Sequence, residues 1–289
     1  MRDLALVCGF SGKFDEALHY FSTALEESRQ LRKYTPREEG VTLGFQGAIL
    51  VRKGELDKAI EVLSRSLVIK QDIHDTSYLL DTVNWLGNAN EITKNWVTAE
   101  KFYQHNLSEY KWIGHLYFAC GAHVGLVRVK HAQKDYAAIL PHLAEAEQLV
   151  QQYEYNDHLA SLRLTQGHVD WEINKKGDTL SFYKHAMIYA LRYNRFLLDE
   201  LLSGRLQGTP LHPIIPYCLE HGEDGRNILI ALCDWWKTGV NDIGIPRPDT
   251  ISPIPEGILL LDAEKIARER ELGDGSKQKS VVEQIETAL

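Results

Sequence analysis

The chain has 289 residues, of which 44% are hydrophobic and 25% are charged, as is ordinary for a folded globular protein. Its formal net charge of −8 argues against a nucleic-acid backbone as the main partner, because that binding needs clustered lysine and arginine. Four scattered cysteines without a C-x-x-C pair indicate neither a disulfide framework nor a zinc ribbon. We therefore expect a reducing, cytoplasmic setting, and the lack of any apolar run of about 18 residues predicts no membrane span.

A nine-residue segment recurs five times in the first two thirds of the chain. It is clearest where AEKFYQHNL at 99–107 matches TLSFYKHAM at 179–187. The five segments begin at intervals of 42, 40, 40 and 40 residues, at Ala17, Ala59, Ala99, Ile139 and Thr179. Twelve positions earlier stand four very small residues and one valine: Ala5, Gly47, Gly87, Val127 and Gly167. A repeat period near 40 is typical of a helical solenoid.

Each repeat is predicted to be two helices joined by a short turn. In the second repeat, residues 41–52 and 57–68 both carry apolar residues at helical spacing, and Gly54 lies in the turn between them. The small residues are expected where the two helices approach closely. A larger residue four positions into the second segment is expected to fill the gap between neighbouring pairs: Phe21, Leu63, Tyr103, Leu143 or Tyr183.

This spacing resembles the tetratricopeptide pattern, in which a glycine of the first helix precedes an alanine of the second by twelve residues. The match is carried by Gly47…Ala59…Leu63, by Leu86-Gly87…Ala99…Tyr103 and by Gly167…Thr179…Tyr183. The resemblance implies an all-α, right-handed superhelical solenoid of antiparallel helix pairs over residues 1–194. The period exceeds the usual 34 residues and is similar to the long repeats of bacterial signalling proteins. The fourth repeat carries Val127 and Ile139 instead of the small pair, so its helices are expected to splay.

The first repeat is expected to be incomplete. Met1 falls in the middle of its first helix, and the apolar residues Leu4, Leu6 and Val7 have no preceding repeat to cover them. Solenoids normally end in a polar cap. We expect either that the sequence is a fragment, with an effector domain before it, or that another element covers this end.

After Asn194 the repeats stop, and seven of the nine prolines lie between Pro210 and Pro255. The region 195–289 is predicted to be a helical cap with helices over 195–206, 211–221, 226–238, 259–271 and 276–288. Residues 240–256 are predicted to be a proline-rich connector. The Trp235-Trp236 pair fits either a cap packed on the last repeat or an exposed anchor for a partner. In general style this tail resembles the carboxyl-terminal regions of bacterial STAND-type signalling ATPases.

No residue pattern indicates catalysis, a metal or a cofactor. The stretch around Gly9 and Gly12 lacks the spacing of a phosphate-binding loop. His115, His123 and His131 are eight residues apart, too far along a helix to share a metal, and no H-E-x-x-H occurs. Cys218 and Cys233 are expected to be buried and inert. We therefore predict that the protein is not an enzyme.

The best functional signal lies on the first helices of the repeats. In the tetratricopeptide architecture these helices line the concave groove, at positions six and three before the small residue and one and four after it. By register these positions are Asp81, Asn84, Asn88 and Glu91 in repeat three, Gly121, Val124, Arg128 and His131 in repeat four, and Ser161, Leu164, His168 and Trp171 in repeat five.

These groove residues suit a peptide. The carboxamides of Asn84 and Asn88 can each donate to and accept from a peptide backbone, and Arg128 could hold a carboxylate with two hydrogen bonds. Trp171 would add an apolar floor. The alternative is that all of these are simply solvated polar side chains.

The sequence thus predicts a non-catalytic module that binds a protein or peptide segment in a concave groove, with neither nucleic acid nor membrane as partner. We expect it to be the sensor or scaffold part of a larger bacterial signalling protein. One alternative is a regulatory domain of a signalling ATPase or transcription regulator that senses a small molecule held between the groove and the tail. Enzyme activity in the tail ranks third.

Overall fold

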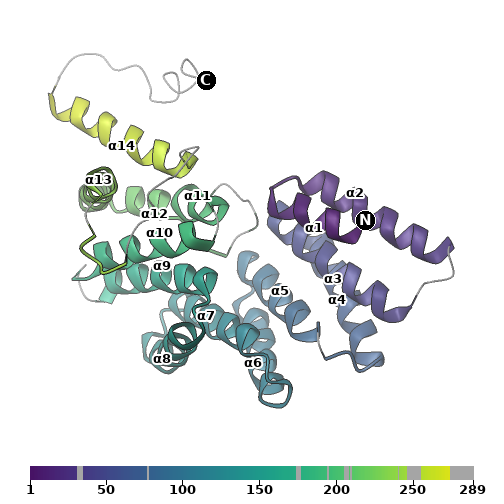
Figure 1. Cartoon of the computed structure of the whole chain (residues 1–289). Coiled ribbons are helices and arrows are strands. Elements are labelled where there is room, and N and C mark those ends of the chain that lie inside the picture. Colours follow the sequence, from purple (N-terminus) through teal and green to yellow (C-terminus); the bar gives the residue numbers. More distant parts are fainter. Residues whose placement is uncertain are drawn as a thin grey trace. The chain divides into compact units, whose positions relative to one another are not determined.

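The computed structural model describes residues 1–30, 35–76, 78–173, 177–193, 195–204, 208, 210–239, 241–245 and 255–273 (Figure 1). These residues form helices α1 to α14, and no strand is assigned among them. The predicted all-α class is therefore confirmed for the described part of the chain. The chain divides into two compact units: Met1–His158 with Leu206–Pro210, and Leu159–Arg205 with Leu211–Leu289.

The first unit is a series of helix pairs that follow the predicted repeats. Each helix packs on the next along the chain, and the first helices of successive pairs also contact one another, α1 with α3, α3 with α5 and α5 with α7. The helices are α1 (Arg2–Phe10), α2 (Phe14–Gln30), α3 (Pro36–Lys53), α4 (Leu56–Asp72), α5 (Leu79–Ile92), α6 (Trp96–Ile113), α7 (Leu116–Ala132) and α8 (Tyr136–Tyr153).

The small residues of the repeats lie where helices approach closely. A Cβ atom added to Gly87 on α5 would lie 2.5 Å from Cε1 of Tyr103 on α6, and one added to Gly47 on α3 would lie 2.4 Å from Cγ of Leu63 on α4. Tyr103 also meets the next pair, because a Cβ atom on Gly125 of α7 would lie 2.5 Å from its ring. The large residue of the second helix therefore fills the space between neighbouring pairs, as predicted.

Local chemistry sets the ends of α3. The hydroxyl of Thr35 accepts a hydrogen bond from the backbone N–H of Glu38, and Pro36 occupies the first turn, where its missing N–H costs nothing. The helix ends at Gly54, whose φ of 86° is readily adopted only by glycine. The predicted turn at Gly54 is therefore found here.

The fourth pair departs from the others. Val127 and Ile139 are buried where the other pairs have small residues, and Leu143 is only partly buried, unlike Phe21 and Tyr103. Pro141 lies inside α8, which begins five residues earlier at Tyr136 and continues past it. The proline therefore lies in the second turn of a helix that continues through it, where it lacks a backbone N–H to donate.

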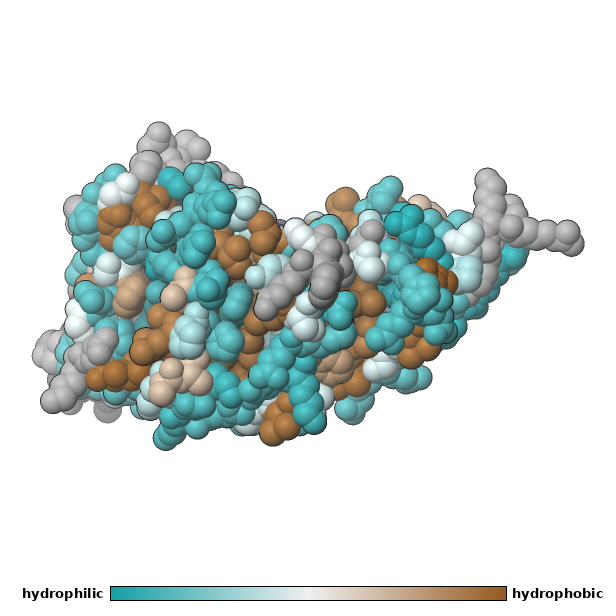
Figure 2. All heavy atoms as spheres, turned by 90° about the horizontal axis from the view of Figure 1, so that it is seen from below, coloured by the Kyte–Doolittle hydropathy of each residue, from teal (hydrophilic) through white to brown (hydrophobic). Residues whose placement is uncertain are grey.

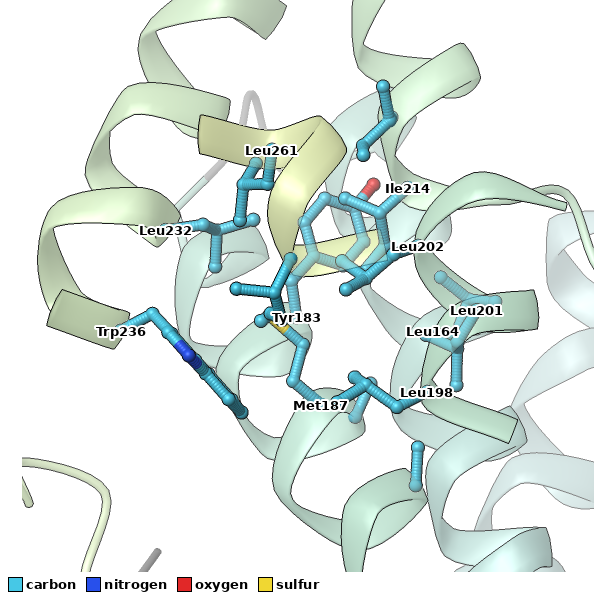
Figure 3. Close-up of a cluster of buried hydrophobic side chains, with 14 of the residues drawn as sticks. Leu164, Tyr183, Met187, Leu198, Leu201, Leu202, Ile214, Leu232, Trp236 and Leu261 are labelled. Atoms are coloured by element: carbon cyan, nitrogen blue, oxygen red, sulfur yellow. The ribbon is translucent and has the colours of Figure 1, made fainter. Parts of the chain in front are cut away.

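The second unit combines the last helix pair with the tail. It contains α10 (Thr179–Tyr193), α11 (Arg195–Ser203), α12 (Ile214–Glu220), α13 (Gly222–Thr238), α14 (Glu256–Gly273) and most of α9 (Asn156–Ile173). As Figure 3 shows, Tyr183 and Met187 of α10 lie among leucines from α9, α11, α13 and α14. Trp235 and Trp236 are 7% and 9% exposed and belong to this core, so they pack internally and are not an exposed anchor.

Because the last helix pair and the tail share one core, the domain boundary lies elsewhere than at the predicted residue 194. Residue 194 was expected to separate repeats from cap, but α10 and α11 on either side of it pack into the same hydrophobic cluster. The contacts instead divide the chain within α9, between His158 and Leu159. Most of the predicted connector 240–256 and the whole predicted helix 276–288 lie outside the described residues.

Figure 2 shows a face on which hydrophilic residues predominate and hydrophobic ones form separate patches. The most exposed large hydrophobic side chains are Leu140, Val97 and Val7, each more than 60% exposed. Among the described helices, none combines the length and the hydropathy needed to cross a membrane.

Candidate binding face of the first unit

Helix α5 carries four of the predicted groove residues at helical spacing. Asp81, Asn84 and Asn88 are partly exposed, whereas Glu91 at the end of the row is 4% exposed. Asn84 and Asn88 lie one helical turn apart on the same side of the helix. We call Asp81, Asn84 and Asn88, together with Gly121 and Arg128 of α7, the binding face.

Arg128 is already paired within the protein. Its Nε donates to Glu91 Oε1 at 2.7 Å and its Nη2 to Glu91 Oε2 at 3.0 Å, the two-bond geometry preferred by guanidinium and carboxylate groups. Burial by itself lowers the pKa of Arg128, but the Glu91 carboxylate and the Tyr103 hydroxyl outweigh it, so that the pKa is raised. The expectation that Arg128 awaits a partner's carboxylate is therefore wrong, because Glu91 occupies that place.

Tyr103 extends this ion pair into a small network. Its hydroxyl lies 2.7 Å from Glu91 Oε2 and 2.8 Å from Asn88 Oδ1, and its single proton can be donated to only one of them at a time. Because Tyr103 is fully buried between Gly87 and Gly125, the network is anchored in the packing of the repeats. Sequence reasoning assigned Tyr103 a packing role only and missed its hydroxyl.

Asn84 lies in a second cluster of the same face. Its Oδ1 accepts a hydrogen bond from Nδ2 of Asn106 at 3.4 Å, and Asn106 is tied to the carbonyl of Leu80 at 2.9 Å. Gly121 gives Asn84 room: a Cβ atom at Gly121 would lie 2.7 Å from Asn84 Nδ2 and 3.1 Å from His158 Cε1. The side chain of Asn84 therefore reaches across the backbone of α7 towards His158.

The two carboxamides offer donors more than acceptors. The Oδ1 atoms of Asn84 and Asn88 both accept internal hydrogen bonds. Their Nδ2 groups donate to no partner among the described residues. The binding face thus presents amide donors one turn apart, which suits a ligand rich in carbonyl oxygens, such as an extended backbone.

Asp81 lies near a buried lysine. Burial raises the pKa of Asp81 to about 6, and burial lowers that of Lys70 to about 8. Lys70 is 1% exposed, and its Nζ donates to Thr82 Oγ1 at 2.6 Å and to the carbonyl of Tyr78 at 3.0 Å. Shifted pairs of this kind also occur at catalytic sites. In this structure, however, Lys70 is too deeply buried for a substrate to reach its amine, and it joins α4 to the start of α5.

His168 and Trp171 do not belong to an open face. His168 is 4% exposed, with its Nδ1 2.8 Å from the Tyr183 hydroxyl and its Nε2 2.8 Å from the carbonyl of His212. The ring of Trp171 is 8% exposed and lies 4.8 Å from that of His221. The predicted role of these two residues in a groove is wrong, because the segment around α12 covers them within the second unit.

His131 lies at the last predicted position, at the end of α7. It is partly exposed, and its ring centroid is 6.4 Å from that of Tyr136 at the start of α8. It therefore lies beside the turn between the two helices, one helical turn beyond Arg128.

Two further histidines and the four cysteines of the described residues are packed inside the protein. His123 and His142 meet across α7 and α8 with their Nδ1 atoms 3.2 Å apart, and no group of three potential metal ligands occurs in the described ranges. The four cysteines are buried, and burial raises the pKa of Cys120 and of Cys218 to about 12, which suppresses thiolate formation.

A cavity of about 180 Å³ lies between α13 and α14 in the second unit. Apolar side chains form most of its wall, and Lys237 and Asp262 also line it. The lining residues are Cys233, Trp236, Lys237, Pro255, Ile258, Leu259, Leu261 and Asp262.

Comparisons with known proteins bear on the fold only. No protein-family model and no curated protein sequence matches the chain. Among solved structures, the chain is similar to BtubC (BKLC) from P. vanneervenii, with a TM-score of 0.52 over 92% of this chain and 95% of that one. At 14% sequence identity, this likeness supports a shared helical architecture and says nothing about a shared activity.

Proposed function

We propose that the protein is a non-catalytic binding module, built as a right-handed tetratricopeptide-like solenoid, that holds a protein or peptide segment on the binding face. The observation that carries the proposal is the pair of amide donors at Asn84 and Asn88, partly exposed and without partners for their Nδ2 groups among the described residues. Amides spaced by one turn match alternate carbonyl oxygens of an extended backbone, which face the same side about 6–7 Å apart, better than they match a compact ligand.

The surroundings of the two amides are rigid, which favours binding. Arg128 and Glu91 are 12% and 4% exposed at their side chains, and they are locked to each other and to Tyr103. Asn106 fixes Asn84 from the other side. A preorganised site loses less conformational entropy when a ligand binds, so a modest contact area can give useful affinity.

A binding role accounts for the titratable groups better than catalysis does. The shifted Lys70 is enclosed and used for structure, and all four cysteines are buried, with burial raising the pKa of Cys120, Cys218 and Cys233. In this proposal the chain is the sensor or scaffold part of a larger cytoplasmic signalling protein. Its task is to bind the partner segment on α5 and α7.

The direct test is capture of a partner by the whole chain and by the variant Asn84→Ala/Asn88→Ala. We expect the double variant to lose the partner and to keep its helical circular dichroism. The matched control is Gln104→Ala/Gln151→Ala, which removes two exposed amides from the second helices α6 and α8 and should leave capture unchanged. Equal capture by all three proteins would place the site elsewhere.

A second candidate function follows from the cavity between α13 and α14. Its size and apolar wall suit a small apolar ligand, whose binding would regulate an attached effector. Because Trp236 lines this cavity, a ligand there should change the tryptophan fluorescence. Titration with a set of small aromatic fragments tests this candidate, and a response that persists in Leu261→Trp, which fills the cavity, would contradict it.

A further inference from the structure

A group of aromatic rings packs together beside the binding face, next to one carboxylate. Tyr117 from the start of α7, Tyr155 from the turn before α9 and His158 from the first turn of α9 contact one another, and Tyr153 stacks on Tyr155. The carboxylate is that of Asp157, which Tyr117 and His158 approach. We call these five residues the aromatic corner. All of them belong to the first unit.

Two of the ring pairs in the corner stand nearly perpendicular to each other. The centroids of Tyr117 and Tyr155 are 5.1 Å apart with an interplanar angle of 85°, and those of Tyr155 and His158 are 6.2 Å apart at 88°. Tyr117 and Tyr153 are 37% and 40% exposed. The faces and edges of large aromatic side chains are therefore available at the surface, which is typical of residues that anchor partners.

Asp157 has no cationic partner among the described residues. Its Oδ2 accepts a hydrogen bond from the Tyr117 hydroxyl, and its side chain is 19% exposed. The nearest basic group is Nδ1 of His158, 4.0 Å away. Burial lowers the pKa of His158, although Asp157 and the hydrogen bond from Nε2 to the carbonyl of Tyr117, 3.1 Å long, act in the opposite direction. No lysine or arginine among the described residues pairs with Asp157, so its carboxylate is available to a basic group of a ligand.

The charge of the surrounding sequence has one sign. No lysine or arginine occurs between Lys134 and Arg163, whereas five carboxylates do: Asp135, Glu145, Glu147, Glu154 and Asp157. Of these, Glu154 and Asp157 lie at the junction of α8 and α9, where the corner is, and their charges favour a cationic ligand there.

The corner adjoins the binding face through Gly121. The position of a Cβ atom on Gly121 is close both to Nδ2 of Asn84 and to the ring of His158, and the His158 ring lies 4.3 Å from that of Tyr117. A segment lying on Asn84 and Asn88 could therefore extend its next side chain into the corner.

We propose that the aromatic corner binds an arginine side chain of the partner segment whose backbone lies on the binding face. The inference rests on the proposed function and names the chemistry of the partner. A guanidinium group stacks on tyrosine faces and pairs with a carboxylate through two planar N–H groups, which an ammonium group cannot do. Oδ1 of Asp157, which has no hydrogen-bond partner among the described residues, is the acceptor that remains for it.

The test uses a fluorescein-labelled peptide of alternating arginine and glycine, with lysine–glycine and glutamate–glycine peptides as comparisons, and measures anisotropy with the full chain. We expect the arginine peptide to bind most tightly, the lysine peptide more weakly and the glutamate peptide not at all. Asp157→Asn keeps an acceptor for the Tyr117 hydroxyl and removes the charge, so the affinity for the arginine peptide should fall about tenfold. The control Glu145→Gln removes one negative charge from the same acidic stretch and should change the affinity by less than about twofold.

A second variant tests the same site without disturbing a buried side chain. Tyr153→Ser alters an exposed ring and should also weaken the arginine peptide, with unchanged melting temperature. Equal affinity for the three peptides, or an equal effect of Asp157→Asn and Glu145→Gln, would overturn the inference. If the arginine peptide does not bind while capture of a partner still depends on Asn84 and Asn88, only the inference about an arginine side chain is wrong. If that dependence is also lost, the proposed function is wrong as well.

Discussion

Helix α5 in the first unit and helix α9 in the second carry the same repeat positions in different surroundings. The position after the small glycine is Asn88 on α5 and His168 on α9, and the position three residues later is Glu91 or Trp171. Asn88 stays partly exposed, whereas His168 is 4% exposed and its ring lies 3.9 Å from that of Tyr217 on α12. Repeat register therefore fixes which side of a helix a residue occupies, but not whether another segment covers that side.

The two units share a glycine–tyrosine contact between paired helices, but the tyrosine hydroxyl has different hydrogen-bond partners in each. In each, a glycine on the first helix accepts a tyrosine ring from the second, Gly87 with Tyr103 and Gly167 with Tyr183. The Tyr103 hydroxyl leads into the ion pair of the binding face, while the Tyr183 hydroxyl contacts buried His168. The same framework thus supports a largely buried ion-pair network beside partly exposed Asn88 in one unit and a histidine–tyrosine contact in the other.

The largest effect is expected from breaking the ion pair of the first unit. Glu91→Ala leaves the Arg128 guanidinium buried without its carboxylate, so the free energy of unfolding should fall by about 3–5 kcal/mol in urea titrations. The double variant Glu91→Leu/Arg128→Met removes both charges and should recover more than half of that loss. A double variant as unstable as Glu91→Ala would show that the pair is not the cause.

A pH effect should come from His123, which meets His142 between α7 and α8. Burial lowers the pKa of His123 to about 4, below its ordinary value of 6.5. The folded state therefore binds fewer protons than the unfolded state, and its stability is present above about pH 6.5 and is lost as the pH falls through 4. The expected loss is about 3 kcal/mol.

Two variants separate the pH effect of His123 from the opposite pH effect of Asp81. His123→Gln should flatten the fall in stability between pH 7 and pH 4 measured by urea titration. Asp81→Asn should make the fall steeper, because the raised pKa of Asp81 stabilises the folded state as the pH drops through about 6. If the profile of His123→Gln matches that of the unchanged chain, His123 is not the titrating group.

A smaller effect is expected from adding one methyl group at the glycine contacts. Gly87→Ala places a Cβ atom 2.5 Å from Cε1 of Tyr103, and Gly167→Ala places one 2.3 Å from Cε1 of Tyr183. Neither ring can move away easily, because the hydroxyl group of each tyrosine is held by hydrogen bonds. Each should lower the free energy of unfolding by about 1–3 kcal/mol. Because the same device operates in both units, the two losses should be similar. A neutral Gly87→Ala would mean that the α5–α6 packing is looser than described.

The repeat pattern predicted much of this fold, because spacing directly records helix geometry. The glycines at 47, 87 and 167 and the large residues paired with them lie where the pattern places them. The site was predicted less completely. Arg128 was assigned to a partner because the sequence does not show that Glu91, 37 residues earlier, reaches it. His168 and Trp171 were misplaced because α12, more than 40 residues later, covers them. Long-range contacts of this kind leave no periodic signal.

The aromatic corner shows what a closer look at the sequence could have found. The hexapeptide YEYNDH at 153–158 concentrates two tyrosines, two carboxylates and a histidine at the junction of α8 and α9. Such a composition is unusual for a helix connection and marks a surface feature. Its link to Asn84 depends on the absent side chain of Gly121, which only the three-dimensional contact reveals.

Cysteine labelling compares the two units at matched positions, since the four native cysteines are buried and should react slowly with a maleimide. If the first unit presents an open face and the second a covered one, Asn88→Cys should react on the order of a hundredfold faster than His168→Cys, with both variants folded by circular dichroism. Equal rates, or faster labelling at position 168, would contradict the assignment of the binding face to α5 and α7.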